Sequence, residues 1–568
     1  MMTNQRSPGR EATCRMRSRR RSVNQVRRDS AQAKTIGFCS LWLAGAALAV
    51  GCGVDRPDHG SPGSGSDAGG GGELVAPDCA TRGPRMTRRL SNLQLRNTLQ
   101  AVFQDPNVPT GDVLNDPVVL GFKADATQSV VRDLDAQLIM NNAETVADWA
   151  VSQKLGQLSS CQTMDATCAK TFVQTLGKKL YREPVAASSV DAYVAMFSAE
   201  TSFAEGARAV ISAMLQSSYV LYRRELGERG NDGLYHLTPY ELASSLSYML
   251  TNGPPDDQLM SAADQGRLVT AADLDREAAR LLSTSQSETA FGIFARNWLV
   301  IDDLATRAKI DPNNRLTDAI RAAMLKETAA MFVNVLRSNA KVAELFTASY
   351  TFLDQTLAGY YDLGGGGSTF QRVELPANTR AHGILGDGAV LTRHALADRS
   401  SPVQRGKLVR ERLLCDEIPP PPPNVDTNLP APSGAVTNRQ RYEEHSKNPI
   451  CNSCHTRMDP VGFSFEHFDA FGRKRDQENG VAIDATGTLS GMSDGDIALD
   501  GLDSLSTYLS TNKDVTQCLT RFMSYTAYGL DRCSQSAIST ELAASNGSVK
   551  AIVMAVIHAP HFTTRTAE

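Results

Sequence analysis

Residues 238–250, TPYELASSLSYML, are the clearest helix signal in the sequence. Thr238 can accept a hydrogen bond from a first-turn amide, Pro239 needs no donor at the first helical position, and Glu241 completes a capping box. The apolar residues that follow share one helical face: Leu242, Leu246, Met249 and Leu250. This face predicts a helix packed against a core, and Gly253 with the two prolines after it should end that helix.

The same signals recur on both sides of this segment. They predict helices from Ser91 to Phe103, around residues 172–180, and at residues 273–282, 288–299, 317–339 and 515–530. No convincing run of residues alternates between apolar and polar as a half-buried strand would. The chain is therefore predicted to be mainly α and, at 568 residues, to contain several modules.

The first 51 residues predict export. Ten basic residues precede a largely apolar run at 36–50 (IGFCSLWLAGAALAV), which is short for a membrane span and suits the apolar region of a signal peptide. Without this segment the chain keeps 48 basic and 60 acidic residues, a net charge near −12. A body this acidic lacks the positive surface that neutralises phosphates, so nucleic acid is not an expected partner.

The apolar run leads into LAVGC at residues 48–52, which resembles a bacterial lipobox. Cys52 would then be lipidated, and its acyl chains would anchor the protein to a membrane. Residues 55–72, rich in Gly, Ser and Pro, would form a flexible tether behind the anchor. The expected location is the cell envelope, with the body facing the periplasm or the cell surface; an ordinary signal peptide with an incidental Cys52 is the alternative.

The remaining cysteines suit an oxidising compartment. Six of them lie outside the Cys-His motif described next: Cys79, Cys161, Cys168, Cys415, Cys518 and Cys533. Proximity in sequence favours disulfides between Cys161 and Cys168 and between Cys518 and Cys533. Cys79 would then pair with Cys415.

Residues 451–455, CNSCH, match the motif that attaches haem c covalently. The Cys451 and Cys454 thiols would add to the haem vinyl groups, and His455 would bind the iron. A Cys451–Cys454 disulfide and half of a zinc site are the alternatives, although no second pair of ligands follows to complete tetrahedral zinc. One covalent haem c is therefore the expected cofactor.

The sixth iron ligand is less clearly marked. Met492 lies in a Gly/Ser-rich segment expected to be a loop, from which its thioether could reach the iron. Met458 is too close to His455 to reach the opposite haem face, Met523 falls in an apolar helix, and His467 stands between aromatic residues. Pro460 should end the attachment helix, and the phenylalanines after it could cover either the haem edge or an ordinary core.

Several longer segments carry a family resemblance: residues 399–407 (RSSPVQRGK), 458–463 (MDPVGF) and 468–473 (FDAFGR), together with CNSCH. They resemble secreted cytochrome-like multi-module proteins of planctomycetes and myxobacteria. The resemblance implies modules of unknown function around one small c-type-cytochrome-like module near the C-terminus.

These observations predict the following organisation: signal peptide 1–51, tether 52–78, helical modules 79–155, 160–228 and 234–364, cytochrome-like module 384–490, and a last helical module 491–565. An electron carrier that docks a redox protein and a haem enzyme both fit, so the sequence leaves enzymatic activity undecided. A surface adhesion or polysaccharide-handling lipoprotein, with a structural Cys-His motif, is the third interpretation. No motif typical of a hydrolase or a phosphate-binding loop is present.

Overall fold

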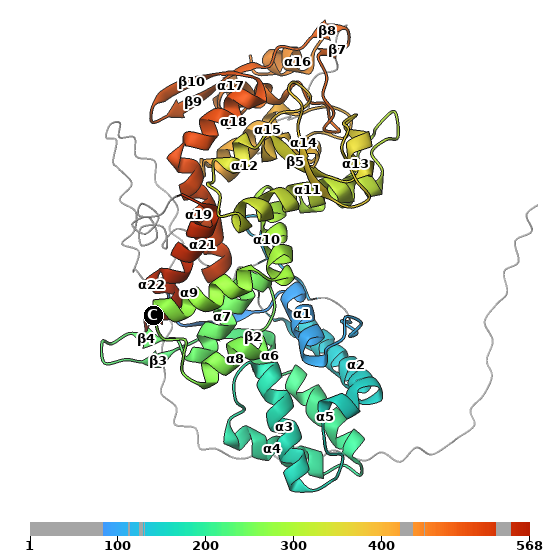
Figure 1. Cartoon of the computed structure of the whole chain (residues 1–568), viewed down its shortest axis with the longest axis vertical. Helices are drawn as coiled ribbons and strands as arrows, with labels where there is room; N and C mark the ends of the chain where they lie inside the picture. The colour runs from blue at the N-terminus through green and yellow to red at the C-terminus, as the bar shows by residue number, and fades with distance from the viewer. Residues whose placement is uncertain are drawn as a thin grey trace, which may run out of the picture. The chain divides into compact units, whose positions relative to one another are not determined.

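The computed structural model (Figure 1) describes residues 83–111, 114–123, 129, 131–420, 436–447, 449–529 and 547–567. These all belong to one compact unit, residues 76–568. The predictions for the signal peptide, Cys52, the tether, Cys79 and Cys533 lie outside the described residues. Within the described ranges, no helix has both the length and the apolar character needed to cross a membrane.

The first part of this unit is helical. Its elements are β1 (Met86–Arg89), α1 (Asn92–Phe103), α2 (Asp133–Leu158), α3 (Ala166–Tyr181), α4 (Ala187–Ser198), α5 (Phe203–Leu215), α6 (Ser218–Leu221) and β2 (Tyr222–Glu225). The antiparallel pair β1–β2 closes this part.

The middle part adds a second set of helices with short strands between them. Its elements are β3 (Glu228–Arg229), β4 (Tyr235–His236), α7 (Pro239–Thr251), α8 (Asp257–Asp264), α9 (Ala271–Leu282), α10 (Ser285–Trp298), η1 (Asp302–Ala305), α11 (Asp318–Arg337), α12 (Glu344–Thr347), β5 (Tyr350–Leu353), α13 (Gln355–Tyr360) and β6 (Gln371–Glu374).

The last part contains the Cys-His motif. Its elements are η2 (Ile384–Gly386), α14 (Gly388–Arg393), α15 (Pro402–Leu408), η3 (Val409–Leu413), α16 (Asn438–His445), α17 (Pro449–Gly462), η4 (Phe463–Phe465), β7 (Gln477–Glu478), β8 (Val481–Ala482), β9 (Thr486–Met492), β10 (Gly495–Asp500), α18 (Gly501–Thr511), α19 (Lys513–Tyr528), α21 (Val549–His558), α22 (Pro560–Thr563) and β11 (Thr564–Arg565). The mainly α prediction is thus confirmed.

The helix starts read from the sequence are correct where a cap was recognised. Thr238 and Glu241 form the expected capping box with Pro239 in the first turn, and Ser91 forms another with Gln94. In each box two otherwise unpaired amides gain acceptors, which fixes the first turn of the helix. Asn252, in the left-handed region at φ 53°, ends α7 just before the predicted stop at Gly253.

The buried side chains form two hydrophobic clusters. One lies among α1 to α6 and includes Phe172, Phe197 and Phe203, whose rings meet at 5.1–6.3 Å. The other extends from α7 to α22 and includes Trp298 and Phe332. Residues 238–250 contribute Leu242, Leu246 and Leu250 to the second cluster, which explains their spacing in the sequence.

A buried carboxylate joins segments that lie far apart in the sequence. Glu225, 1% exposed, is an ion-pair partner of Arg88, Arg223 and Arg565. Burial alone would raise the pKa of Glu225, but the three positive charges outweigh it and lower the pKa to about 2. Beside this cluster, β11 pairs with β4, and the Thr566 amide donates to the Gly83 carbonyl at 3.0 Å.

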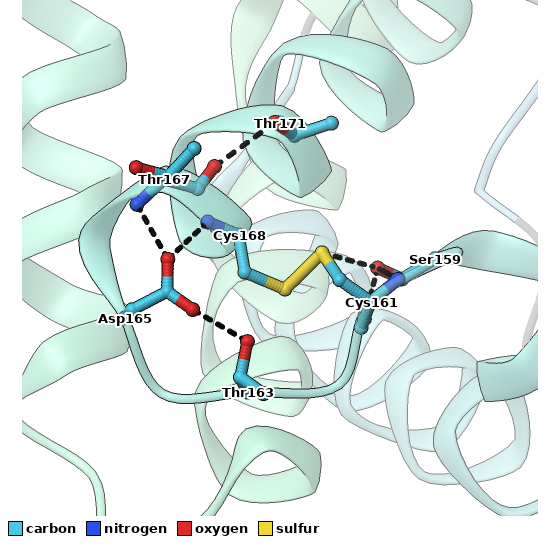
Figure 2. The surroundings of a disulfide bond; sticks show 7 residues. All are labelled: Ser159, Cys161, Thr163, Asp165, Thr167, Cys168 and Thr171. Atoms are coloured by element: carbon cyan, nitrogen blue, oxygen red, sulfur yellow. Dashed lines mark hydrogen bonds between the residues drawn. A yellow bond between two sulfur atoms is a disulfide. The ribbon is translucent and has the colours of Figure 1, made fainter.

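One of the two disulfides agrees with the pairing predicted from the sequence, and the other differs from it. Cys161 and Cys168 are bonded as predicted, beside a turn in which Asp165 accepts from the amides of Thr167 and Cys168 at 3.0 and 2.9 Å (Figure 2).

Cys415 is bonded to Cys518, 103 residues away, with a Cα–Cα distance of 5.4 Å. The predicted pairs Cys518–Cys533 and Cys79–Cys415 are therefore wrong. The contact between η3 and α19 brings residues 415 and 518 together, and proximity along the sequence could not reveal it.

Candidate functional site

The Cys-His motif lies on the first turns of α17. Positions 451, 454 and 455 are spaced i, i+3 and i+4, so a helix places all three side chains on one face. Cys451, Cys454 and His455 are half-buried there. Cys451 and Cys454 form no disulfide with each other, since the bonded cysteines of the described residues are those of the two disulfides above.

Glycines fix the second half of α17 against its neighbours. A Cβ at Gly406 of α15 would collide with the Met458 carbonyl oxygen, and one at Gly462 would collide with that of Pro402. On another side, a Cβ at Gly487 of β9 would collide with the carbonyl oxygen of Pro460. Only glycine allows the backbones to approach this closely. The second half of α17 is thereby fixed, and it positions the first half, which carries the motif.

Pro460 does not end the helix, contrary to the prediction, because α17 continues to Gly462. A proline inside a helix removes one hydrogen bond to the carbonyl four residues earlier, here Thr456. Thr456 is exposed, so water can satisfy that carbonyl. The packing of Gly462 and the fully buried Val461 holds the last turn in place.

His455 is oriented by a buried carboxylate that the sequence analysis missed. Its Nδ1 lies 2.8 Å from Oδ2 of Asp459, which is 3% exposed. Ser446 Oγ donates to the same oxygen at 3.2 Å. When Nδ1 donates to the carboxylate, Nε2 is the ring nitrogen left to bind a metal. The i, i+4 spacing of His455 and Asp459 was the signal that could have revealed this pair.

A second imidazole lies beside the first. The His445 and His455 rings meet edge to face, with centroids 5.1 Å apart. His445 is the last residue of α16, and Asn438 is the first. The Asn438 side chain donates to the Ser400 carbonyl at 2.9 Å, and the Asn438 backbone amide donates to Glu478, which together hold the helix in place. The sequence analysis did not select His445, ten residues before His455.

Met492 is the last residue of strand β9 in a hairpin with β10, not in a loop as expected. β9 packs along α17. Gly487 contacts Pro460, and the Arg410 guanidinium donates both to Ser490 Oγ on β9 and to the Arg457 carbonyl on α17. The strand therefore runs from the end of α17 back toward its motif-bearing turns. Met492 itself is partly buried against the larger cluster.

The other candidate ligands lie in structural positions. Met458 and Met523 are buried, and His467 Nδ1 lies 3.1 Å from the Arg475 carbonyl oxygen. Phe465 and Phe468 belong to the larger hydrophobic cluster, which supports the interpretation of these rings as ordinary core.

Buried arginines secure the segments around α17. Arg405, fully buried, donates to the carbonyls of Phe465, Phe468, Leu391 and Asp469 at 2.7–3.1 Å. Burial lowers the pKa of Arg405 to about 10, so the guanidinium stays charged at neutral pH. Arg410 donates to the Arg457 carbonyl on α17 at 3.0 Å. Arg405, in the 399–407 segment noted in the sequence, thus secures the chain that follows α17.

The residues present fit a covalent haem c. Two thiols and an imidazole share one helix face, and the imidazole is oriented through Nδ1 by a buried carboxylate whose other oxygen, Oδ1, is itself without a partner. Among the described residues, no group of three or more His, Cys, Asp and Glu side chains is arranged to hold a bare metal ion.

Comparison with family models identifies four modules in the chain. Residues 88–152 match PSD3 (protein of unknown function, DUF1587), residues 168–225 PSD5 (DUF1595), residues 237–363 PSD4 (DUF1592) and residues 381–478 PSCyt3 (DUF1588). The last match spans the Cys-His motif. No curated protein and no solved structure matches the chain. The chain therefore carries four modules of a planctomycete-type multi-module family, each described as a protein of unknown function.

Proposed function

We propose that this protein is a cell-envelope lipoprotein that binds one haem c through Cys451, Cys454 and His455. The observation that carries the proposal is the oriented imidazole: His455 shares a helix face with both thiols while Asp459 holds its Nδ1. The cytochrome-associated module at residues 381–478 supports the same assignment. When bound, the haem iron would supply one-electron exchange.

The residues of the site would have separate roles. Cys451 and Cys454 would fix the haem to α17, and His455 would bind the iron through Nε2. Asp459 would hold the ring and strengthen it as a ligand, because a carboxylate that accepts from Nδ1 increases the electron density on Nε2. The contacts of Gly406 and Gly462 would keep this arrangement from shifting.

Covalent attachment can be tested on the protein matured with haem. Haem should stay with the wild-type polypeptide on a denaturing gel and be lost from Cys451→Ser/Cys454→Ser. The matched control is Cys161→Ser/Cys168→Ser, which also removes two closely spaced cysteines and should keep its haem. Matured protein without haem, but with a Cys451–Cys454 disulfide, would refute the proposal.

The spectrum of the iron distinguishes the two redox uses. A low-spin reduced spectrum, lost in Met492→Ala, would support an electron carrier with Met492 as sixth ligand. A high-spin spectrum that responds to carbon monoxide or peroxide would support a haem enzyme. His445→Ala belongs in the same series, because its ring already lies beside His455.

A further inference from the structure

A cleft of about 1200 Å³ lies where three of the matched modules meet. Its walls come from α1 in the first module, α3 in the second, and α7, α8 and α10 in the third. Ligand sites are frequently built at such junctions, and this volume exceeds the 300–1,000 Å³ or so that is typical for a drug-sized molecule. The cleft could therefore hold a ligand of several repeating units.

Contacts between the modules hold the walls together. Thr98 Oγ1 and the Tyr248 hydroxyl lie 2.6 Å apart, and the Asn97 side chain donates to the Asn252 carbonyl at 2.9 Å. Lys178 pairs with Asp264 at 2.6 Å across α3 and α8. Because these contacts connect all three modules, the cleft is formed before a ligand arrives, which lowers the entropy cost of binding.

Four of the seven charged residues that line the cleft form ion pairs within the protein, and exposed Lys179 and Asp257 carry opposite charges. Lys178 and Asp264 pair with each other, Asp256 pairs with Arg280, and Asp105 pairs with Lys154. The Arg182 guanidinium, on a residue only 3% exposed, donates to backbone carbonyls that include that of Tyr222. Such a surface has no concentrated positive charge for a phosphate or a polyanion.

Amides and hydroxyls are among the groups exposed to the cleft. Three exposed glutamines line it, Gln104, Gln174 and Gln286, and so do the exposed threonines Thr175 and Thr289. A side-chain amide both donates and accepts, as a sugar hydroxyl does. Pro254, Pro255 and Met260 add apolar surface to the same cleft, against which the CH groups of a sugar ring can pack.

We propose that this cleft binds a neutral oligosaccharide. The site is separate from the Cys-His motif, so the proposal stands whether or not haem is bound. A neutral, multi-unit, hydroxyl-rich ligand is the chemistry that matches the paired charges, the exposed amides and the volume.

The test uses the full chain and a panel of neutral hexasaccharides: cellohexaose, laminarihexaose, mannohexaose and chitohexaose. Isothermal titration should detect binding of at least one at micromolar to millimolar concentration. Gln174→Ala/Gln286→Ala should weaken that binding at least tenfold without lowering the thermal unfolding temperature. Thr175→Trp, which places a bulky ring at an exposed position of the cleft wall, should also weaken it.

The matched control is Gln137→Ala/Gln153→Ala, which removes two exposed glutamines of α2 outside the cleft and should bind as the wild type does. Failure of all four hexasaccharides to bind would overturn the proposal. So would binding that the Gln174/Gln286 variant leaves unchanged, or binding only of an acidic oligogalacturonate or a proline-rich peptide.

Discussion

The Cys415–Cys518 disulfide should stabilise the protein more than the Cys161–Cys168 disulfide. In the chain-entropy description, a cross-link stabilises by restricting the unfolded chain, and its effect grows with the loop it closes. A sequence separation of 103 residues corresponds to about 4.7 kcal/mol and one of 7 residues to about 2.4 kcal/mol. Replacing both cysteines of the longer loop by serine should therefore cost about 2.3 kcal/mol more than the same change in the shorter loop.

A tryptophan beside the Cys415–Cys518 disulfide provides the probe. Trp298 is fully buried, and its Nε1 donates to the Arg412 carbonyl at 2.8 Å; the Cys518 sulfur lies 3.5 Å from the same oxygen. Trp298 fluorescence, measured in a Trp42→Phe/Trp149→Phe background, will thus follow unfolding next to the longer loop. Guanidinium unfolding curves of the wild type and the two double-serine variants, read by this signal and by circular dichroism, give the free-energy differences.

Two results would refute this reasoning. If Cys415→Ser/Cys518→Ser costs no more than Cys161→Ser/Cys168→Ser, loop length does not determine the contribution of these bonds. If peptide mapping finds Cys518 bonded to Cys533, the pairing itself is wrong and the sequence-based assignment is correct.

Three further predictions concern other parts of the chain. Burial lowers the pKa of His394 to about 3, so the folded protein holds this imidazole in its neutral form. The contribution of His394 to the free energy of unfolding should be fully present above pH 6.5 and fall by up to about 1.4 kcal/mol per pH unit toward pH 3. Acid titration of His394→Asn should therefore show a shallower loss of stability than the wild type, with the exposed His236→Asn as control. Asp459→Asn should raise the reduction potential of the haem-loaded protein in a redox titration, because His455 becomes a weaker donor; an unchanged potential would mean that the contact with Asp459 does not tune the site. Metabolic labelling with a fatty-acid analogue should mark the wild type but not Cys52→Ala, and equal labelling of both would remove the lipobox assignment.

Local signals in the sequence predicted the local structure well. The capping boxes at Ser91 and Thr238 depend only on residues within one turn, so the helix starts could be recognised without tertiary information. The motif at residues 451–455 is equally local, and its placement on one helix face follows from its spacing alone.

Features that depend on distant contacts could not be predicted in this way. Cys415 meets Cys518 because η3 packs on α19, and the sequence shows no sign of that contact. Pro460 was expected to stop a helix, but the packing of Gly462 on Pro402 outweighs its local preference. Met492 was assigned to a loop because of its glycine neighbours, but Gly491 and Gly495 lie in the two strands of a hairpin, on either side of its turn. The oligosaccharide cleft combines three modules and has no counterpart in any single stretch of sequence.

The ion cluster around Glu225 has a consequence for the order of maturation. Arg88 and Arg565 meet the same carboxylate, although 477 positions separate them. If the chain is exported N-terminus first, as proposed, residues 451–455 emerge before residue 565, and this cluster would close only after the Cys-His motif is outside. Until then Glu225 lacks one of its three positive neighbours, and the motif is accessible on an incompletely assembled chain. An attachment enzyme that needs an unfolded motif would have this interval in which to act.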